Sequence, residues 1–487
     1  MKLYDVAIIG GGISGFTAAL RLQKKGFNTL VIESHSQIGG CAGYFTKKNF
    51  SFDVGATTLV DFIEGGVGGN FFQEIGLPIP EGEYLDYIAW LPDRKINLYR
   101  DNTRWKEERL LKLGNSKNHI AFYELLDRIT NVFWEATRKN IQIPIHRFSE
   151  LKKAISAIGF KNLGLLKYYN HTMLDVLKFF HLEKEKPLIG LLSMLIEDTV
   201  HSKIEEAPFI NATLGTTIRG AGLMRAKGGM KALWKILENH YNSLGGEIYK
   251  SNQVISFVKQ NNLWEITTKK GNLQAKKIIS SLPLDNTFTI SPEFIQKKLK
   301  PYIQKNEVYK GGAIVVFLGI PEKEIETESI THHQILLDYD RELGNGNNMF
   351  ISVSGKEDAL SAPIGFRSVM ISTHCKNLEW ENLSKEEYES KKKEIGDRLI
   401  DYARRVYPSL ATNPVVYEIG TPRTYQKFTK RTSVGGFKQT LSNSNWKSVP
   451  QDIGIENFCI TGDNTWPGLG TVAGLVSGRI AAELSSH

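Results

Sequence analysis

Strand and helix patterns alternate at the start of the chain. Residues 5–9 and 29–32 are short, almost wholly apolar runs that are typical of buried strands. Between them, from Phe16 to Leu22, apolar residues recur at helical spacing. This order predicts a βαβ unit, in which the helix crosses over and brings the second strand parallel to the first.

The patterns change character several times along the rest of the chain. Residues 62–218 are mainly helical and irregular, with amphipathic stretches that carry lysines. Helices are then predicted at 230–244 and 384–407, and strands at 254–258, 263–268, 277–281, 312–318 and 369–373. Residues 457–484 again read as strand, glycine turn and helix. We therefore expect a first domain that is interrupted by insertions and completed near the end of the chain.

A glycine motif lies between the first strand and the first helix. Gly10, Gly12 and Gly15 form a GxGxxG pattern. The first glycine permits a tight turn, the second lets the backbone approach a pyrophosphate, and the third lets helix and strand pack closely. The first helical turn, with Ile13 and Ser14, offers unpaired N–H groups to phosphates. The motif in this context predicts a dinucleotide site.

An acidic residue follows the second strand. Glu33, with Ser34 after it, lies at the distance where a carboxylate accepts hydrogen bonds from the hydroxyls of an adenosine ribose. A carboxylate there disfavours the 2′-phosphate of NADP. These features alone do not separate NAD from FAD.

Four further segments distinguish the two cofactors. Residues 39–43 (GGCAG) and 52–58 (FDVGATT) follow the ribose acid, and 460–463 (ITGD) and 467–474 (PGLGTVAG) lie near the end of the chain. They resemble the flavin signatures of FAD enzymes in the amine oxidase and carotenoid desaturase superfamily. The resemblance spans the whole chain and implies non-covalently bound, extended FAD.

The resemblance also implies how FAD lies in the site. The adenine is expected near Glu33 and Val254, and the flavin near residues 55–58 and 471–472. Asp463 can reach the ribityl hydroxyls, and a helix that opens near Thr471 can direct its positive end at the flavin ring. The residues assigned to FAD are Gly10, Gly12, Ile13, Ser14, Gly15, Glu33, Ser34, Gly40, Cys41, Ala42, Gly55, Ala56, Thr57, Thr58, Val254, Gly462, Asp463, Gly470, Thr471 and Val472.

Within the superfamily, residues 39–59 are most similar to the carotenoid C-3′,4′ desaturases, and more broadly to phytoene desaturases, carotenoid isomerases and retinol saturases. Residues 226–230, 421–424 and 462–479 support this likeness. Amine oxidases usually have arginine directly after the glycine pair, where this chain has Cys41. The resemblance therefore implies an oxidoreductase that acts on a long apolar polyene.

The implied fold class is α/β: a Rossmann-like FAD-binding domain of the glutathione-reductase type, as in the amine oxidase superfamily, with an inserted mixed α+β substrate domain. We expect the FAD-binding domain to comprise residues 1–61, 225–284 and 416–487. The substrate domain is then expected to comprise residues 62–224, mainly helical, and 285–415.

The direction of the reaction stays open at this stage. We expect desaturation by hydride transfer to flavin N5, with quinone or oxygen as the electron acceptor. A redox-neutral isomerase or a saturase that uses reduced FAD is the alternative enzyme. A non-catalytic prenyl-lipid carrier on the same fold is the alternative of another class, and the complete set of Gly10, Glu33 and Asp463 motifs disfavours it.

Candidate catalytic and metal residues are less well defined. Glu197, Asp198 and His201 cluster in the central segment, and we interpret them as solvated surface. His332 and His333 are interpreted as a loop, since they have no third ligand at metal-site spacing. We therefore assign no catalytic residue and no metal.

Composition limits the setting of the protein. The chain of 487 residues has 61 Lys plus Arg against 52 Asp plus Glu, a net charge of +9, without the arginine tracts or zinc-finger spacing of nucleic-acid binders. Three separated cysteines indicate a reducing cytoplasm. Neither a cleavable signal nor a transmembrane helix is predicted. The basic charge and the lysine–phenylalanine mixture at 149–181 predict peripheral contact with an anionic membrane surface.

Overall fold

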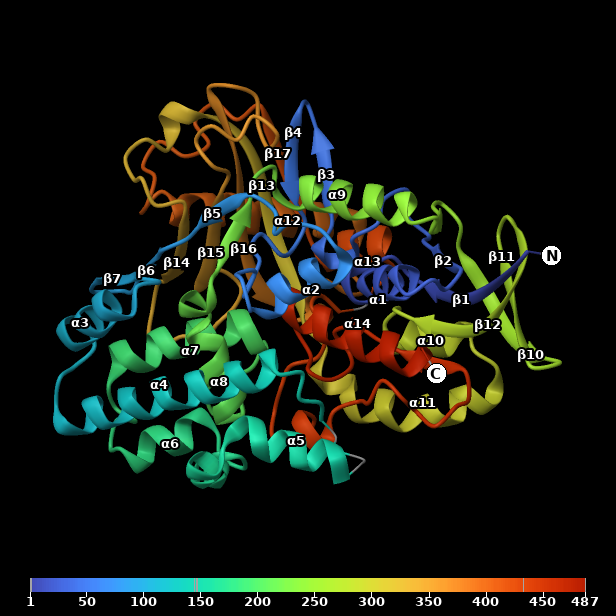
Figure 1. Ribbon diagram of the computed structural model, residues 1–487. Coiled ribbons are helices and arrows are strands. Elements are labelled where there is room, and N and C mark those ends of the chain that lie inside the picture. The colour runs from blue at the N-terminus through green and yellow to red at the C-terminus, as the bar shows by residue number, and fades with distance from the viewer. Residues whose placement is uncertain (1, 144, 146–147, 432, 487) are drawn as a thin grey trace.

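Strand β1 (Leu3–Ile9) lies inside a seven-stranded sheet in the computed structural model, which describes residues 2–143, 145, 148–431 and 433–486. The strand order is β10-β11-β12-β1-β2-β9, and β18 pairs with β12 (Figure 1). The other strands are β2 (Thr29–Ile32), β9 (Glu247–Tyr249), β10 (Val254–Gln260), β11 (Leu263–Thr268), β12 (Gly271–Ser280) and β18 (Phe458–Ile460).

The first helix crosses between two parallel strands. β1 pairs in parallel with β2, from Val6 opposite Thr29 to Ile9 opposite Ile32, and α1 (Ile13–Lys24) connects them. The predicted βαβ unit is therefore confirmed. The other helices that pack around this sheet are α2 (Val67–Ile75), α9 (Gly229–Ser243), α10 (Leu284–Ile290), α11 (Glu293–Asn306) and α14 (Thr471–Ser485).

The helix that ends the described chain lies directly against α1 (Figure 1). A Cβ atom at Gly474 of α14 would lie 2.5 Å from Cγ2 of Ile13, and one at Gly478 would lie 2.4 Å from the carbonyl oxygen of Ser14. Only glycine permits an approach this close. The two ends of the chain therefore form one structural unit.

A second seven-stranded sheet has the order β17-β13-β16-β15-β14-β6-β7. Its neighbouring strands pair antiparallel except β14 and β6, which are parallel. The strands are β6 (Tyr87–Trp90), β7 (Lys95–Leu98), β13 (Gly312–Pro321), β14 (His332–Leu336), β15 (Asn348–Val353), β16 (Phe366–Cys375) and β17 (Val416–Gly420).

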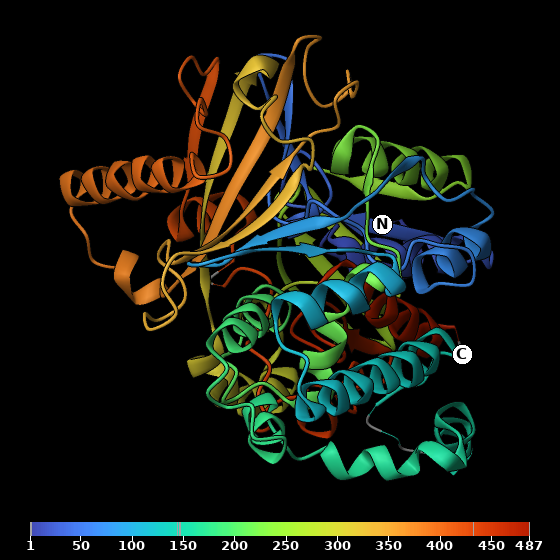
Figure 2. The same ribbon diagram turned by 90° about the vertical axis from the view of Figure 1, so that its left-hand side faces the viewer.

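Side chains of β13 alternate between the two faces of this sheet, as the period of a strand requires. Ile314 and Val316 pack in a core with α12 (Lys385–Ala403) on one face. Val315 and Phe317 belong to a different cluster on the opposite face, and both line a large cavity. Figure 2 shows α12, in orange, to the left of the sheet.

A helical layer lies below the second sheet in both views (Figures 1 and 2). Its core joins Leu191 and Leu195 to Tyr87 of β6, so the helices are anchored on the sheet. The helices are α3 (Asn102–Lys112), α4 (Lys117–Arg138), α5 (Phe148–Ile158), α6 (Met173–Phe179), α7 (Lys186–Val200) and α8 (Phe209–Thr216), with 3₁₀ segments η2 (Phe160–Tyr168) and η3 (Ile218–Ala221).

Short elements connect the two parts. The two-stranded pairs are β3 (Tyr44–Lys47) with β4 (Phe50–Asp53) and β5 (Gly82–Tyr84) with β8 (Met224–Ala226), and the remaining helix is α13 (Pro422–Thr429). Five shorter 3₁₀ turns, among them η1 (Gly40–Ala42), complete the assignment.

The interpretation of His332 and His333 as a loop is wrong. Both side chains are fully buried in β14, although they are polar. His332 shares hydrogen bonds with Thr331 and Ser352, and His333 Nε2 lies 2.9 Å from the Tyr407 hydroxyl. These partners satisfy the imidazoles, so the strand tolerates them in its interior.

In the described ranges, no helix combines the length and the apolar character that crossing a membrane requires.

Candidate cofactor and substrate site

A cavity of about 1590 Å³ extends from the first βα turn to the helical layer. Every residue that the sequence analysis assigns to FAD lines this cavity, except Gly15. The motifs come from both ends of the chain and from β10, and the fold brings them to one wall. The volume exceeds the roughly 300–1,000 Å³ of typical small-molecule pockets, so the cavity has room for more than one ligand.

Each of the three motif glycines is required for a different structural reason. Gly10 has a φ of +97°, which a side chain would strain. A Cβ at Gly15 would lie 2.5 Å from Cβ of Ser281, so this glycine serves helix–strand packing rather than the cavity wall. A Cβ at Gly12 would have Oγ of Ser281 as its nearest neighbour, 3.8 Å away, so there is open space on the cavity side. This difference matches the expected roles of the second and third glycines.

Two helix N-termini open toward the cavity. Gly12 precedes α1 and Gly470 precedes α14, and neither helix has a side-chain cap or an acidic residue in its first turn. Both ends therefore keep free N–H groups and positive partial charge, which favour anionic or electron-rich ligand groups. Because α1 and α14 pack against each other, both ends open into the same cavity.

Glu33 also contacts the glycine turn. Its Oε2 accepts a 2.8 Å hydrogen bond from the Gly11 amide, and its Oε1 accepts one of 2.7 Å from the His35 amide. Val254 lines the same end of the cavity. Oε1 also accepts a 3.2 Å bond from the Ser34 hydroxyl, so Oε2 is the oxygen with room for a further bond, such as one from a ribose hydroxyl. Its contact with the ribose stays a prediction.

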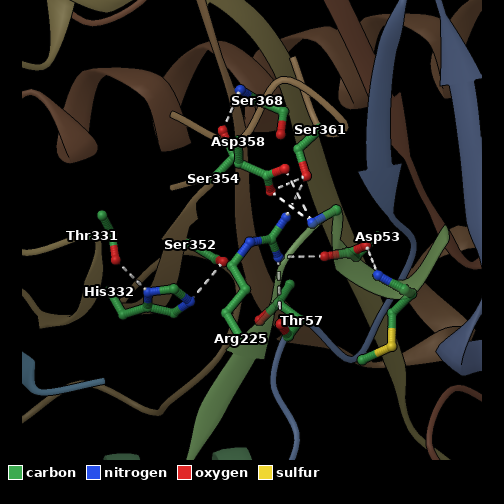
Figure 3. A network of polar contacts seen from close by, with 12 residues as sticks. Asp53, Thr57, Arg225, Thr331, His332, Ser352, Ser354, Asp358, Ser361 and Ser368 are labelled. Atoms are coloured by element: carbon green, nitrogen blue, oxygen red, sulfur yellow. Dashed lines mark hydrogen bonds and ion pairs between the residues drawn. The ribbon is translucent and has the colours of Figure 1, made fainter. Parts of the chain in front are cut away.

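A buried ion pair holds the loop that is expected beside the flavin (Figure 3). Arg225 of β8 contacts the Asp53 carboxylate, and Asp53 also accepts a 2.9 Å bond from the Met230 amide at the start of α9. Arg225 reaches the Thr57 carbonyl at 3.4 Å as well. The aspartate of the DVG segment therefore positions residues 54–58 and does not itself line the cavity. Arg225 is a contributor that sequence reasoning missed.

A serine of α14 organises the C-terminal part of the site. Ser477 Oγ accepts a 3.1 Å bond from the Gly462 amide and lies 2.8 Å from the hydroxyls of both Thr461 and Thr465. This network fixes the turn that precedes Asp463. Ser477 lies within the GLVSGR stretch, but no pattern marked it as a site residue.

Asp463 forms an ion pair that the sequence did not indicate. Arg431 Nη2 lies 2.6 Å and 2.7 Å from the two carboxylate oxygens, and both side chains line the cavity. Burial would lower the pKa of Arg431, but Asp463 and Cys41 beside it hold that pKa above its ordinary value. Arg431 is therefore a fixed positive charge beside the flavin motifs. It belongs to no recognisable pattern and is identified only in the folded chain.

The far part of the cavity is apolar. It extends along the helical layer, where α5, η2 and α8 face it, and along the inner face of the second sheet. The apolar lining residues include Phe133, Trp134, Ile141, Ile155, Ile158, Leu163, Leu166, Leu214, Ile218, Met349, Phe350 and Met370. This part suits a long hydrocarbon.

The central acidic cluster is at least partly exposed, as the sequence analysis interprets it, but two of its residues also lie at the cavity wall. Asp198 and His201, at the end of α7, line the cavity together with His374 and Gln334. Glu197 lies behind them and pairs with His374, Nδ1 to Oε2, at 3.6 Å. The chain brings α7, β14 and β16 together at this point, so their proximity was not visible in sequence spacing. Among the described residues, no three His, Cys, Asp or Glu side chains form a group that could hold a metal ion.

The residues of the polar end fit FAD. Gly12 leaves room for a pyrophosphate, two helix N-termini without side-chain caps open into the cavity, and the Glu33 carboxylate lies beside the glycine turn. The geometry defines a dinucleotide-binding protein with an adjoining apolar substrate chamber.

Comparisons with known proteins agree with this geometry. The family model described as flavin containing amine oxidoreductase matches residues 13–484. The chain belongs to this family, so it is an oxidoreductase with FAD as its cofactor and not a carrier. The expected fold class and superfamily are thereby confirmed.

Individual relatives cover nearly the whole chain. Prolycopene isomerase of Daucus carota is 26% identical over 99% of this chain and 80% of its own length. The lycopene-forming phytoene desaturase of Pantoea ananas is 21% identical over 98% of each chain. A crystal structure of an oxidoreductase from Methanosarcina mazei shares the fold, with a TM-score of 0.64 and 15% identity over 98% of this chain and 100% of its own.

Proposed function

We propose that this protein is an FAD-dependent oxidoreductase that desaturates a long apolar polyene of the carotenoid type. The observation that carries the proposal is the continuity of one cavity, with dinucleotide motifs at one end and an apolar chamber at the other. Bound FAD supplies a hydride acceptor at the junction. The apolar walls would hold an extended hydrocarbon chain and exclude water. They would thereby keep the reacting carbons oriented toward the flavin.

Redox-neutral isomerisation of a polyene is the second candidate. The similarity to a carrot prolycopene isomerase over 99% of this chain favours it. Both reactions are expected in the same chamber of the same flavoprotein, so the residues that bind FAD do not distinguish them. They differ in whether the product has lost two hydrogens.

Product analysis separates the candidates. The gene is expressed in a host that accumulates a carotenoid, and the pigments are resolved by chromatography and mass spectrometry. A product two hydrogens lighter supports desaturation, and a product of equal mass with changed geometry supports isomerisation. A Gly12→Val variant, which blocks the pyrophosphate position, serves as the matched control without cofactor. Unchanged pigments with a flavin-loaded wild-type protein contradict both.

Quinone or oxygen is the proposed electron acceptor for desaturation. Anaerobic incubation of the reduced enzyme with a soluble quinone, and separately with oxygen, tests this. Re-oxidation of the flavin spectrum by neither would contradict the choice.

We also propose that the enzyme collects its substrate at a membrane surface. Phe148, Phe160 and Phe179 are 82%, 81% and 66% exposed, unusual values for large apolar side chains. Exposed lysines stand among them at 152, 153, 161, 167 and 178. The same segments, α5 and η2, line the apolar chamber with their inner sides. The exposed lysines would contact anionic lipid headgroups, and the exposed phenylalanines would insert into the apolar layer beneath them.

A further inference from the structure

A group of polar side chains interrupts the otherwise apolar chamber. Asp198 accepts a 3.0 Å hydrogen bond from Nε2 of Gln334, and the ring of His201 packs against that of His374 at a tilt of 57°, with ring centres 4.6 Å apart. All four residues line the cavity. Placing polar groups beside a hydrocarbon costs free energy unless their polar atoms are hydrogen-bonded.

One acceptor of this group has no partner. Gln334 is 2% exposed, and its Oε1 makes no hydrogen bond to any residue that the structure describes. Its Nε2 is held by Asp198, so the amide orientation is fixed by that bond. A buried amide oxygen at a cavity wall that has no hydrogen-bond donor among the described residues indicates that the group is positioned to bind a ligand.

The surroundings of Asp198 favour its neutral form. Its side chain is exposed at the cavity wall, where the surrounding protein still desolvates the carboxyl and raises its pKa, with Glu197 on α7 acting in the same direction. His374 on β16, Arg219 on η3 and the bond from Gln334 on β14 act in the opposite direction. The net pKa lies above the ordinary range of an aspartate, so both protonation states are accessible nearer neutral pH.

The pKa values of the other titratable groups in the cluster are shifted by other causes than that of Asp198. Burial lowers the pKa of His374, but the hydrogen bond to Glu197 and the negative charges of Glu197 and Asp198 together outweigh it and raise that pKa. Burial keeps the pKa of His201 well below its usual value, so His201 is neutral. Tyr87 of β6 also faces Asp198, and burial raises the pKa of its phenol. Asp198 is thus the carboxyl of this cluster that lines the cavity and is able to gain or lose a proton.

The cluster lies where the chamber meets the cofactor end. Tyr87 interacts with Thr58, which belongs to the loop expected beside the flavin. On the other side, a Cβ at Gly435 would lie 2.5 Å from Cε1 of His201, and the backbone of Gly435 interacts with Cys41. Asp198 is therefore connected to the Thr58 loop through Tyr87, and His201 of the same cluster is connected to Cys41 through Gly435.

We infer that Asp198, positioned by Gln334, is the catalytic residue that exchanges a proton with the polyene. The inference rests on the proposed function. In desaturation, one carbon loses a hydride to bound FAD. The adjacent C–H bond breaks, its proton goes to the Asp198 carboxylate, and its electron pair becomes the new double bond.

In isomerisation the same carboxyl acts in both directions. It donates its proton to one carbon of a double bond, the remaining single bond rotates, and the proton returns to the carboxylate. Electrons and atoms then balance without a net redox change.

The test replaces the carboxyl with an isosteric amide. Asp198→Asn is expected to keep FAD and to bind the polyene, while turnover falls by roughly 10²–10⁴-fold, the usual contribution of a general acid or base. Asp198→Glu should restore part of the turnover. Glu197→Gln changes an adjacent carboxyl that does not line the cavity, and it serves as the matched control with a much smaller loss.

A second measurement is independent of turnover. In infrared difference spectra of the flavin-free protein, the carbonyl band of a protonated carboxyl should titrate above the ordinary aspartate range. This band should be absent in Asp198→Asn and present in Glu197→Gln. For desaturation, the wild-type rate should rise with pH through the same transition, since the carboxylate is the active form; for isomerisation that starts from the acid, it should fall.

The possible outcomes test the role of Asp198 separately from the proposed function on which it rests. Undiminished turnover in Asp198→Asn, or weaker polyene binding with an unchanged maximal rate, overturns the inference and leaves the proposed function standing. Absence of any polyene conversion by flavin-loaded wild-type protein overturns the proposed function and the inference with it.

Discussion

Arg431 holds both carboxylate oxygens of Asp463, at 2.6 Å and 2.7 Å, at the wall of the cofactor cavity. Removing one partner leaves the other as an unpaired charge in a largely buried position, which costs more than the pair contributes.

Arg431→Gln is therefore expected to destabilise the FAD-free protein by about 2 kcal/mol, the range of hydrogen bonds to charged groups, and to lower its flavin content. Thermal unfolding and flavin absorbance measure the two effects. Arg398→Gln is the control, since the pair of Arg398 with Glu394 is exposed and contributes little. Equal stability of both variants would show that the Arg431 pair is dispensable.

Glu33→Ala should weaken FAD binding by a factor of about 10–100, because one charge-assisted bond to ribose is worth roughly 1.5–3 kcal/mol. Glu33→Gln keeps the shape and one acceptor oxygen, so its loss should be smaller. Titration of the apoprotein with FAD, followed by flavin fluorescence, gives both dissociation constants. An unchanged constant for Glu33→Ala would remove the ribose assignment.

Gly12→Val and Gly15→Val should fail in different ways. A side chain at Gly12 meets only open space, so the protein should fold but lose FAD. At Gly15 the added Cβ lies 2.5 Å from Ser281, and the helix–strand packing itself should be disrupted. Circular dichroism together with flavin content separates the two results. Full FAD occupancy in Gly12→Val would contradict the assigned pyrophosphate path.

Membrane attachment should depend on charge and salt. Each basic residue near an anionic surface contributes about 1 kcal/mol, so replacing Lys152, Lys153 and Lys161 with Glu should reduce vesicle binding at least about a hundredfold. The same change at Lys297, Lys298 and Lys300 of α11 is the control. Flotation with anionic and neutral vesicles at low and high salt measures this. No lipid-bound fraction of wild-type protein in any condition would exclude the membrane surface.

The sequence predicts the fold, and the motifs that it assigns to the cofactor line one cavity, because these features are local. GxGxxG, Glu33 and the turn before α14 each combine a backbone requirement and a ligand contact within a few residues. Arg431 and Asp198 are different, since their positions at the cavity wall become apparent only when α7, β14, Arg431 and residues 433–436 come together in the folded chain.

Buried polar residues were the main source of wrong interpretations. His332 and His333 look like a loop in sequence because strands seldom bury two adjacent imidazoles. Their partners, Ser352 and Tyr407, lie on other elements, and only the folded chain shows that the polar atoms are satisfied.

The close packing of α14 on α1 also sets an order of events during synthesis. The glycine turn and Glu33 leave the ribosome early, but Gly462, Asp463 and the start of α14 are made only near the end of the described chain. Until Gly474 and Gly478 reach α1, one wall of the cavity does not exist. The nascent protein must therefore wait for its cofactor until translation has passed α14, and its apolar chamber must meanwhile be shielded from aggregation.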